Sequence, residues 1–171
     1  MSPVQPRVRI PVGVVVERRR AKSQWIDFVW RPLTALEGVP ETAPWTKLAG
    51  DEELATFYVG AAEVELYPSE TTNYRDNLAS GTPQLWVVLR RTGAEPPFVL
   101  RMVTADPAEG EGYTQVGDDL VEPVPMPDSI ADAIVAFVQE HHVERVFFKR
   151  KRDRADPEAL APRGPMRRDR K

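Results

Sequence analysis

The strongest constraint on the fold is the apolar run inside QLWVVLRR, residues 84–91. Side chains of a strand point alternately to its two faces, so a run without a polar interruption predicts a strand that is covered on both faces. The loop residues Ser-Gly-Thr-Pro at 80–83 come directly before it. We therefore expect this strand at the centre of a sheet.

The stretch before that loop carries a second strand signal. In AAEVEL, residues 61–66, apolar and acidic residues alternate with the period of a strand that has one solvated face. Gly60 separates this segment from residues 56–59, and a residue without Cβ can turn a hairpin or permit a bulge. We expect residues 56–59 and 62–67 to pair antiparallel.

Other apolar segments complete the predicted fold. Strands are expected at residues 8–17, 25–36 with a break at Pro32, 45–48, 98–104 and 120–124. One long helix is expected from Pro127, because Ile130, Ile134, Phe137, Val138 and His141 form one stripe at helical spacing. The prediction is an α+β fold that is mainly antiparallel β, a sandwich or partly open barrel, with this C-terminal helix packed on the sheet.

Positive and negative charges are distributed unevenly along the chain. Residues 149–171 contain ten Lys and Arg against four Asp and Glu, a local charge of +6, which leaves −9 on residues 1–148. We expect a flexible lead-in at 1–6, a single domain at 7–148 and a disordered basic tail at 149–171. Such a tail suits nucleic acid, an acidic partner or the acidic body of the same protein.

The sequence lacks the residues that several classes of chemical function require. The chain has no cysteine, which excludes disulfides and thiolate chemistry. His141 and His142 are neighbours on the predicted helix and point about 100° apart, so they do not converge on one metal ion. No phosphate-binding glycine motif occurs, and the apolar run at 12–16 is too short to enter a membrane. We expect a soluble, cytoplasmic protein with no cofactor, no metal and no membrane insertion.

Residues 70–77 are the best candidate for a small binding site. After Pro68 ends the strand, Ser69 is expected to cap a short helical turn. Glu70, Tyr74, Arg75 and Asn77 then offer carboxylate, phenol, guanidinium and amide groups between two strands. The alternative is that these groups only satisfy the local backbone and an ion pair of Arg75.

The second candidate contact is the basic run Lys149, Arg150, Lys151 and Arg152, which follows Phe147 and Phe148. Basic charge beside aromatic rings can bind single-stranded nucleic acid. A contact with a protein, or with the acidic body of the same chain, is favoured over nucleic acid.

Five segments resemble a known family. They are PVGVVVERR at 11–19, WRPLTALEGVPE at 30–41, ELYPSETTNYRDNL at 65–78, LWVVLRR at 85–91, and VEPVPMP with HHVERVFFKRKRD between 121 and 153. The chain resembles an uncharacterised bacterial family encoded beside formate dehydrogenase genes, sometimes labelled molybdopterin-guanine dinucleotide biosynthesis protein A. The resemblance implies a role near maturation or assembly of a molybdenum-dependent formate dehydrogenase and brings no catalytic residues with it.

Three functions follow as hypotheses. The first is a non-enzymatic accessory protein that binds a formate dehydrogenase subunit or assembly factor through residues 70–77 and the basic run. The second is an enzyme or carrier acting on molybdenum cofactor or its guanine nucleotide, with phosphate contacts from Arg75, Arg90, Arg91 and Arg101. The third is nucleic-acid binding by the tail. The first is preferred, because no glycine-rich phosphate loop follows the first strand.

Overall fold

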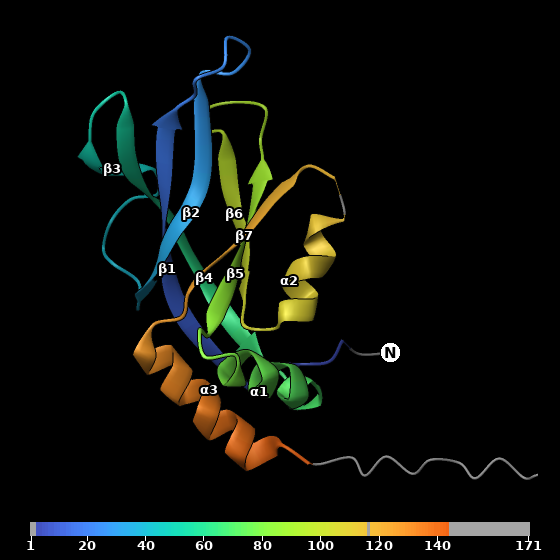
Figure 1. Cartoon of the computed structure of the whole chain (residues 1–171). Helices are drawn as coiled ribbons and strands as arrows, with labels where there is room; N and C mark the ends of the chain where they lie inside the picture. The colour runs from blue at the N-terminus through green and yellow to red at the C-terminus, as the bar shows by residue number, and fades with distance from the viewer. Residues whose placement is uncertain (1–2, 116, 144–171) are drawn as a thin grey trace, which may run out of the picture.

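In the computed structural model, which describes residues 3–115 and 117–143, seven strands form two antiparallel sheets (Figure 1). The first sheet has the order β2-β1-β4-β3 and contains β1 (Val8–Arg20), β2 (Phe28–Glu37), β3 (Thr46–Gly50) and β4 (Leu54–Leu66). The second has the order β6-β5-β7 and contains β5 (Gln84–Arg91), β6 (Phe98–Thr104) and β7 (Asp119–Pro125). The expected antiparallel architecture and the central position of β5 are confirmed. The expected tail lies outside the described residues.

The hydrophobic core lies between the two sheets. The central strands contribute side chains with no exposed surface, Val12, Val14 and Val16 from β1 and Leu85, Val87 and Leu89 from β5. Between the sheets β4 lies close to β6, and the edge strand β2 lies close to the edge strand β7. No hydrogen-bonded ladder joins the sheets among the strands that the structure describes. The body is therefore a two-sheet sandwich whose borders approach one another.

Three α-helices occur in the described part of the chain, where the sequence predicted one long helix. They are α1 (Thr71–Ala79), α2 (Pro107–Thr114) and α3 (Asp128–His141), and a 3-10 turn, Pro68–Glu70, precedes α1. The first two are short and lack an apolar stripe, so periodicity did not reveal them as full helices. No helix within the described residues is long and apolar enough to cross a membrane.

The long helix α3 begins and ends close to its predicted bounds, but it does not simply lie on a sheet. It packs against α1, and both helices lie together at one end of the sandwich (Figure 1). The rings of Tyr74 and Phe137 meet edge to face, with their centroids 6.1 Å apart. The helix pair thereby closes this end of the core.

The hairpin expected at Gly60 is wrong, because β4 runs without interruption from Leu54 to Leu66. Val14 of β1 pairs with Gly60 and Val15 pairs with Tyr58, so β4 carries one extra residue there. This is a β-bulge, and Gly60 has the positive φ of 133° that other residues rarely adopt. The sequence located the irregularity but not its kind.

Candidate binding cleft

A cleft of about 450 Å³ opens between the start of α1, the start of α2 and the N-terminal arm. Its walls are formed by Val4, Tyr67, Ser69, Glu70, Asn73, Tyr74, Asp106, Ala108 and Glu109. Two of the residues predicted as contacts, Glu70 and Tyr74, are among them. The other predicted residues are placed elsewhere, as described below.

Asn77 lies behind the wall and holds α1 against the second sheet. Its Nδ2 donates to the carbonyl oxygens of Gln84, at 2.8 Å, and Ala105, at 2.9 Å. Its Oδ1 accepts from the N–H of Gln84 at 3.0 Å. The side chain is buried and faces backbone on both sides, so Asn77 positions the cleft without facing it. The alternative interpretation was that residues 70–77 only satisfy local backbone; Asn77 does bond to backbone, but Ala105 is distant in the sequence.

Tyr74 contributes a buried hydroxyl to the cleft. The residue is 2% exposed, and its oxygen accepts the N–H of Tyr67 at 3.0 Å. The phenol hydrogen has no acceptor among residues 3–115 and 117–143. Burial, with added repulsion from Asp106, Glu109 and Glu70, raises the pKa of Tyr74 to about 12. The group therefore keeps its proton at neutral pH and is available as a hydrogen-bond donor.

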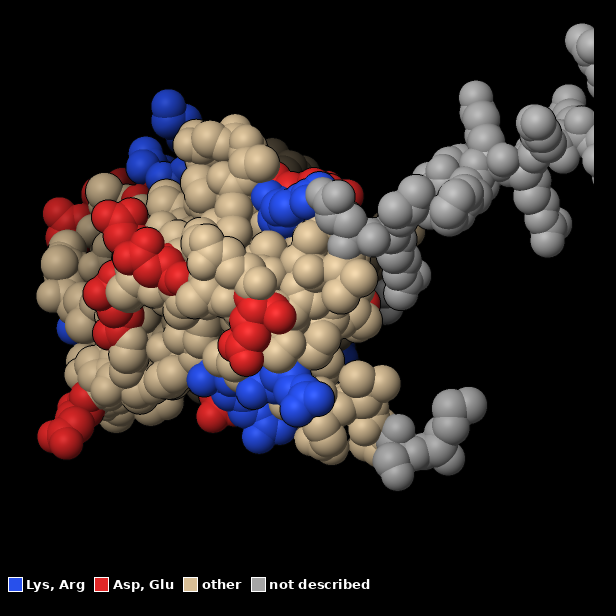
Figure 2. All heavy atoms as spheres, turned by 90° about the horizontal axis from the view of Figure 1, so that it is seen from below, with Lys and Arg blue, Asp and Glu red and all other residues tan. Residues whose placement is uncertain are grey.

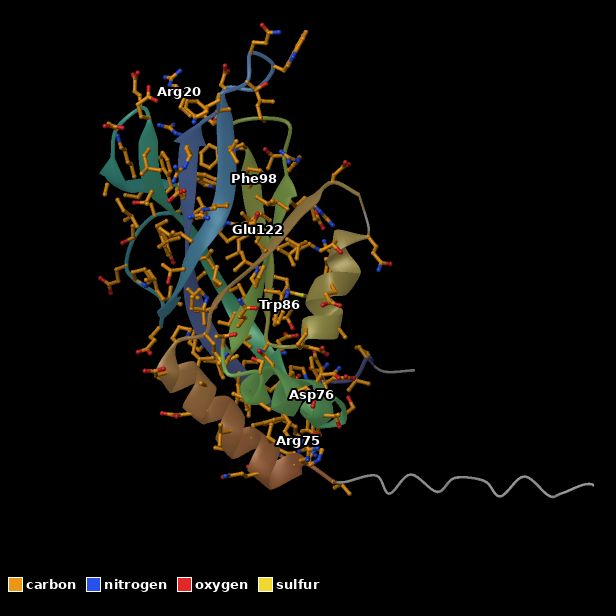
Figure 3. All side chains as sticks on the ribbon, in the orientation of Figure 1. Arg20, Arg75, Asp76, Trp86, Phe98 and Glu122 are labelled. Atoms are coloured by element: carbon orange, nitrogen blue, oxygen red, sulfur yellow. The ribbon has the colours of Figure 1, made fainter. Side chains whose placement is uncertain are left out.

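The opposite wall is the first turn of α2. Asp106 caps this helix, because its Oδ1 accepts from the N–H groups of Ala108, at 2.9 Å, and Glu109, at 3.4 Å. The helix is held close to β5 through Gly110, where an added Cβ would lie 2.6 Å from the Cβ of Trp86. Trp86 lies on the α2 side of β5 (Figure 3). The lack of a side chain at Gly110 thus lets α2, which Asp106 caps and which carries Glu109, pack closely on β5.

Three carboxylates share the cleft without a cation. Asn73 Nδ2 donates to Glu70 Oε2 and to Asp106 Oδ2, each at 3.2 Å. Thr104 Oγ1 donates to Glu109 Oε2 at 2.7 Å. These donors are neutral, and none of the three carboxylates forms an ion pair with Lys, Arg or His in the part of the chain that the structure describes. Like charges in one cleft repel, so a positively charged group would be stabilised there.

Tyr67 extends the cleft toward β4. Its hydroxyl donates to Glu65 Oε2 at 2.7 Å, and this bond, with burial and the charge of Glu65, raises the pKa of Tyr67 to about 12.

Asp and Glu side chains also occur in several groups on the end of the molecule that carries α1 and α3 (Figure 2). No cluster of three or more possible metal ligands occurs within the described residues. The cleft therefore offers carboxylate acceptors and protonated phenols.

Arg75 is not among the residues that line the cleft. It is exposed on α1, and its Nη1 is 3.1 Å from Nε2 of His142, just beyond α3. It lies near Asp76, at the opposite end of the molecule from Arg20 (Figure 3). Lys149, Arg150, Lys151 and Arg152 lie outside the described residues.

The arginines considered for a phosphate site have separate partners. Arg90 Nε is 3.2 Å from Asp119 Oδ1, while the guanidinium of Arg91 stacks over Phe98 at 5.1 Å. The guanidinium of Arg101 lies 5.3 Å from the ring centre of Tyr113. Together with Arg75 beside His142, these contacts give each arginine a different neighbour.

Sequence reasoning missed Tyr67, Asn73, Asp106 and Glu109 as cleft residues. One signal was present, because an aspartate directly before a proline is typical of a helix start. That signal could have identified Asp106 as a cap. It could not have placed Asp106 beside Glu70, 36 positions earlier in the chain.

Comparison with known proteins gives a family and no function. Neither the curated proteins nor the solved structures contain a match to the chain. A family match begins at the same proline as the resemblance drawn from sequence and ends within one residue of it. Because this match covers residues 11–152 of 171, the chain belongs to the family described as protein of unknown function (DUF3305).

Proposed function

We propose that the protein is a non-enzymatic accessory protein that binds a basic segment of a partner in the cleft between α1 and α2. The observation that carries the proposal is the set of carboxylates of Glu70, Asp106 and Glu109 in one cleft with Tyr74, whose phenol hydrogen has no acceptor in the described part of the chain. Lysine and arginine side chains supply donors and positive charge to carboxylates. The Tyr74 hydroxyl can at the same time donate to a main-chain carbonyl of the bound segment.

Binding accounts for this site better than catalysis. A phenol with a pKa of about 12 is not a base at neutral pH, and both phenols that face the cleft have such values. The carboxylates of Asp106 and Glu109 already accept hydrogen bonds that fix their orientation. The site thus presents fixed acceptors of the kind that recognise a cationic ligand.

The partner is proposed to be a subunit or assembly factor of a molybdenum-dependent formate dehydrogenase, in the cytoplasm. This step rests on the resemblance of residues 11–153 to a family encoded beside formate dehydrogenase genes. In that proposal, the run Lys149–Arg152 in the tail forms a second contact between this protein and the partner.

The test is affinity purification of the tagged full chain from its native host, grown with formate and molybdate. We expect a formate dehydrogenase subunit to bind the wild type and to be lost with the double variant Glu70→Gln, Glu109→Gln. The control variant Glu41→Gln, Glu111→Gln removes the same charge at exposed positions outside the cleft and should retain the partner.

Equal recovery with the cleft variant and the control would contradict the cleft as the binding site. Thermal stabilisation by GTP with magnesium, without recovery of any subunit, would instead support an enzyme or carrier of the cofactor nucleotide. A ligand at a hundred times its Kd adds about 2.7 kcal/mol of stability, so such binding would be visible.

A further inference from the structure

We infer that the protein's own basic run, residues 149–152, occupies the acidic cleft and competes there with the partner. The inference rests on the proposed binding site and adds its regulation. Its basis is the charge of the cleft, the free donor in it, and the place at which the chain leaves the described domain.

The cleft and the basic run are complementary in charge. Glu70, Asp106 and Glu109 bring three carboxylates into one cleft with no cationic partner in residues 3–115 and 117–143. The run contains four consecutive basic residues with no acid between them. The second sign of a ligand is Tyr74, which lines the cleft and is 2% exposed; its hydroxyl accepts the N–H of Tyr67, but its own hydrogen has no acceptor among residues 3–115 and 117–143.

His142 fixes the exit of the chain beside the cleft. An arginine only donates hydrogen bonds, so Nε2 of His142, 3.1 Å from Arg75 Nη1, must accept. Nδ1 then carries the hydrogen and donates to Thr71 Oγ1 at 3.0 Å. Thr71 is the direct neighbour of Glu70 in the cleft wall, so the chain leaves the domain next to this wall.

The length of the intervening chain suffices. Seven positions separate His142 from Lys149. Seven residues span at most about 25 Å when extended, which exceeds the width of a cleft of this volume. The run is thus tethered within reach of Glu70 and Glu109. A short tether gives an effective concentration on the order of 1 mM.

The experiment measures binding of a labelled peptide with the sequence VFFKRKRDR, residues 146–154, to the full chain. The first variant replaces Lys149, Arg150, Lys151 and Arg152 by glutamine within the full chain. We expect this variant to bind the peptide about tenfold more tightly than the wild type, since a segment at about 1 mM competes tenfold with a probe of 0.1 mM Kd.

A matched control replaces Arg163, Arg167, Arg168 and Arg170 by glutamine, which changes the charge equally at the distal part of the tail. We expect it to bind the peptide like the wild type. Adding Glu70→Gln and Glu109→Gln to the first variant should abolish the gain, whereas adding Glu41→Gln and Glu111→Gln should retain it.

The outcomes separate the two proposals. Self-occupancy would be overturned if the wild type and the first variant bound the peptide equally while the added substitutions Glu70→Gln and Glu109→Gln (the cleft variant) still abolished peptide binding. That result would leave the binding site standing. Undiminished binding in the cleft variant would overturn the site itself. A dimer that dissociates when the run is neutralised would overturn the intramolecular contact, because the run then occupies the cleft of a second copy.

Discussion

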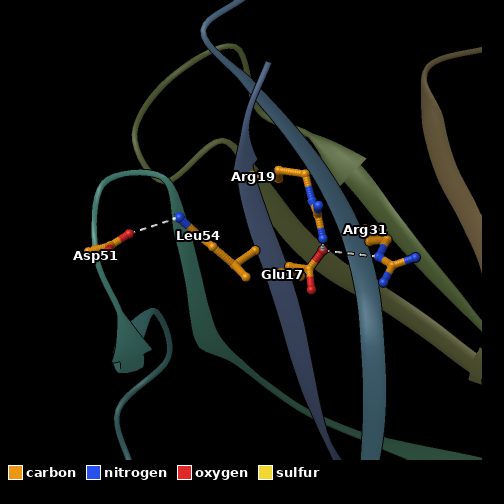
Figure 4. Close-up of polar contacts among 5 residues, drawn as sticks. All are labelled: Glu17, Arg19, Arg31, Asp51 and Leu54. Atoms are coloured by element: carbon orange, nitrogen blue, oxygen red, sulfur yellow. Dashed lines mark hydrogen bonds and ion pairs between the residues drawn. The ribbon is translucent and has the colours of Figure 1, made fainter. Parts of the chain in front are cut away.

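Glu17 and the cleft carboxylates show two ways in which this protein treats negative charge. Glu17 is 8% exposed on β1, and its Oε1 accepts from Arg31 Nε at 3.2 Å and Arg19 Nη2 at 3.3 Å (Figure 4). In the same region, the exposed Asp51 accepts from the N–H of Leu54 (Figure 4) and from that of Glu53, and both bonds lower its pKa. Charges here are matched by arginines or by backbone.

The cleft differs from the surroundings of Glu17 because its carboxylates receive only neutral donors among the described residues. Asn73 and Thr104 satisfy individual oxygen atoms, but they bring no positive charge. Glu17 has arginines beside it, whereas the three cleft carboxylates, of which Asp106 also caps α2, have no cationic partner among the described residues. Their mutual repulsion is retained at some cost in stability, as is typical of binding sites.

The largest expected effect comes from closing the space that positions the cleft wall. Gly110→Ala would place a Cβ against the Trp86 side chain and push α2 away, at a cost of about 1–3 kcal/mol in the free energy of unfolding. Gly112→Ala is the control, because nothing lies within 4 Å of its added Cβ. It should leave stability unchanged or raise it by up to about 1 kcal/mol. Denaturant titration measures both, and equal effects would refute the packing role of Gly110.

The next effect tests the paired carboxylate. Glu17→Gln should destabilise the fold by about 1–2 kcal/mol, because two hydrogen bonds lose their charge and Arg19 and Arg31 are left facing a neutral group. Both arginines are about half exposed, which limits the loss. Chemical unfolding checks the value, with the exposed Glu41→Gln as control. A stability equal to that of the wild type would show that the arginines do not stabilise Glu17.

The phenols of Tyr67 and Tyr74 make the stability of the fold depend on pH. Folding raises the pKa of Tyr67 and Tyr74 from 10.0 to about 12, so the stability that they contribute is full below pH 10 and falls as the pH rises to about 12. Absorbance of tyrosinate should show Tyr67 and Tyr74 ionising late, and Tyr58, whose pKa burial also raises, should ionise above its ordinary pH. Glu65→Gln should lower the pKa of Tyr67 selectively. Unchanged ionisation of Tyr67 in this variant would exclude Glu65 as the cause.

The smallest expected change in stability is a gain, whereas the change expected for Glu17→Gln is a loss. Glu109→Gln removes repulsion from Glu70 and Asp106 while its amide oxygen can still accept from Thr104. We expect a gain of a few tenths of a kcal/mol at low ionic strength, which disappears in high salt because ions screen exposed charges. Thermal unfolding at two salt concentrations measures this. A clear loss of stability would mean that the carboxylate serves the fold.

Much of the framework followed from local pattern. The uninterrupted run of β5, the strand β6 at Phe98–Thr104 and the stripe of α3 were predicted close to their observed bounds. Ser69 was predicted as a helix cap, but it donates to Glu70 Oε1 instead, and no side chain caps α1. Helix α1 is held by Asn77 and Tyr74, which bond to backbone and pack on α3, and these distant contacts leave no local pattern.

The sequence by itself determined the strand and helix segments whose apolar spacing is strong, the negative body and the positive tail. These depend on residue type and on neighbours a few positions away. The tertiary structure alone decided that β4 bulges at Gly60, that Asn77 faces backbone, and that Glu70, Asp106 and Glu109 share one cleft. Such contacts join residues far apart in the chain, and they form only after burial of the core brings α1 and α2 to the same end of the sheets.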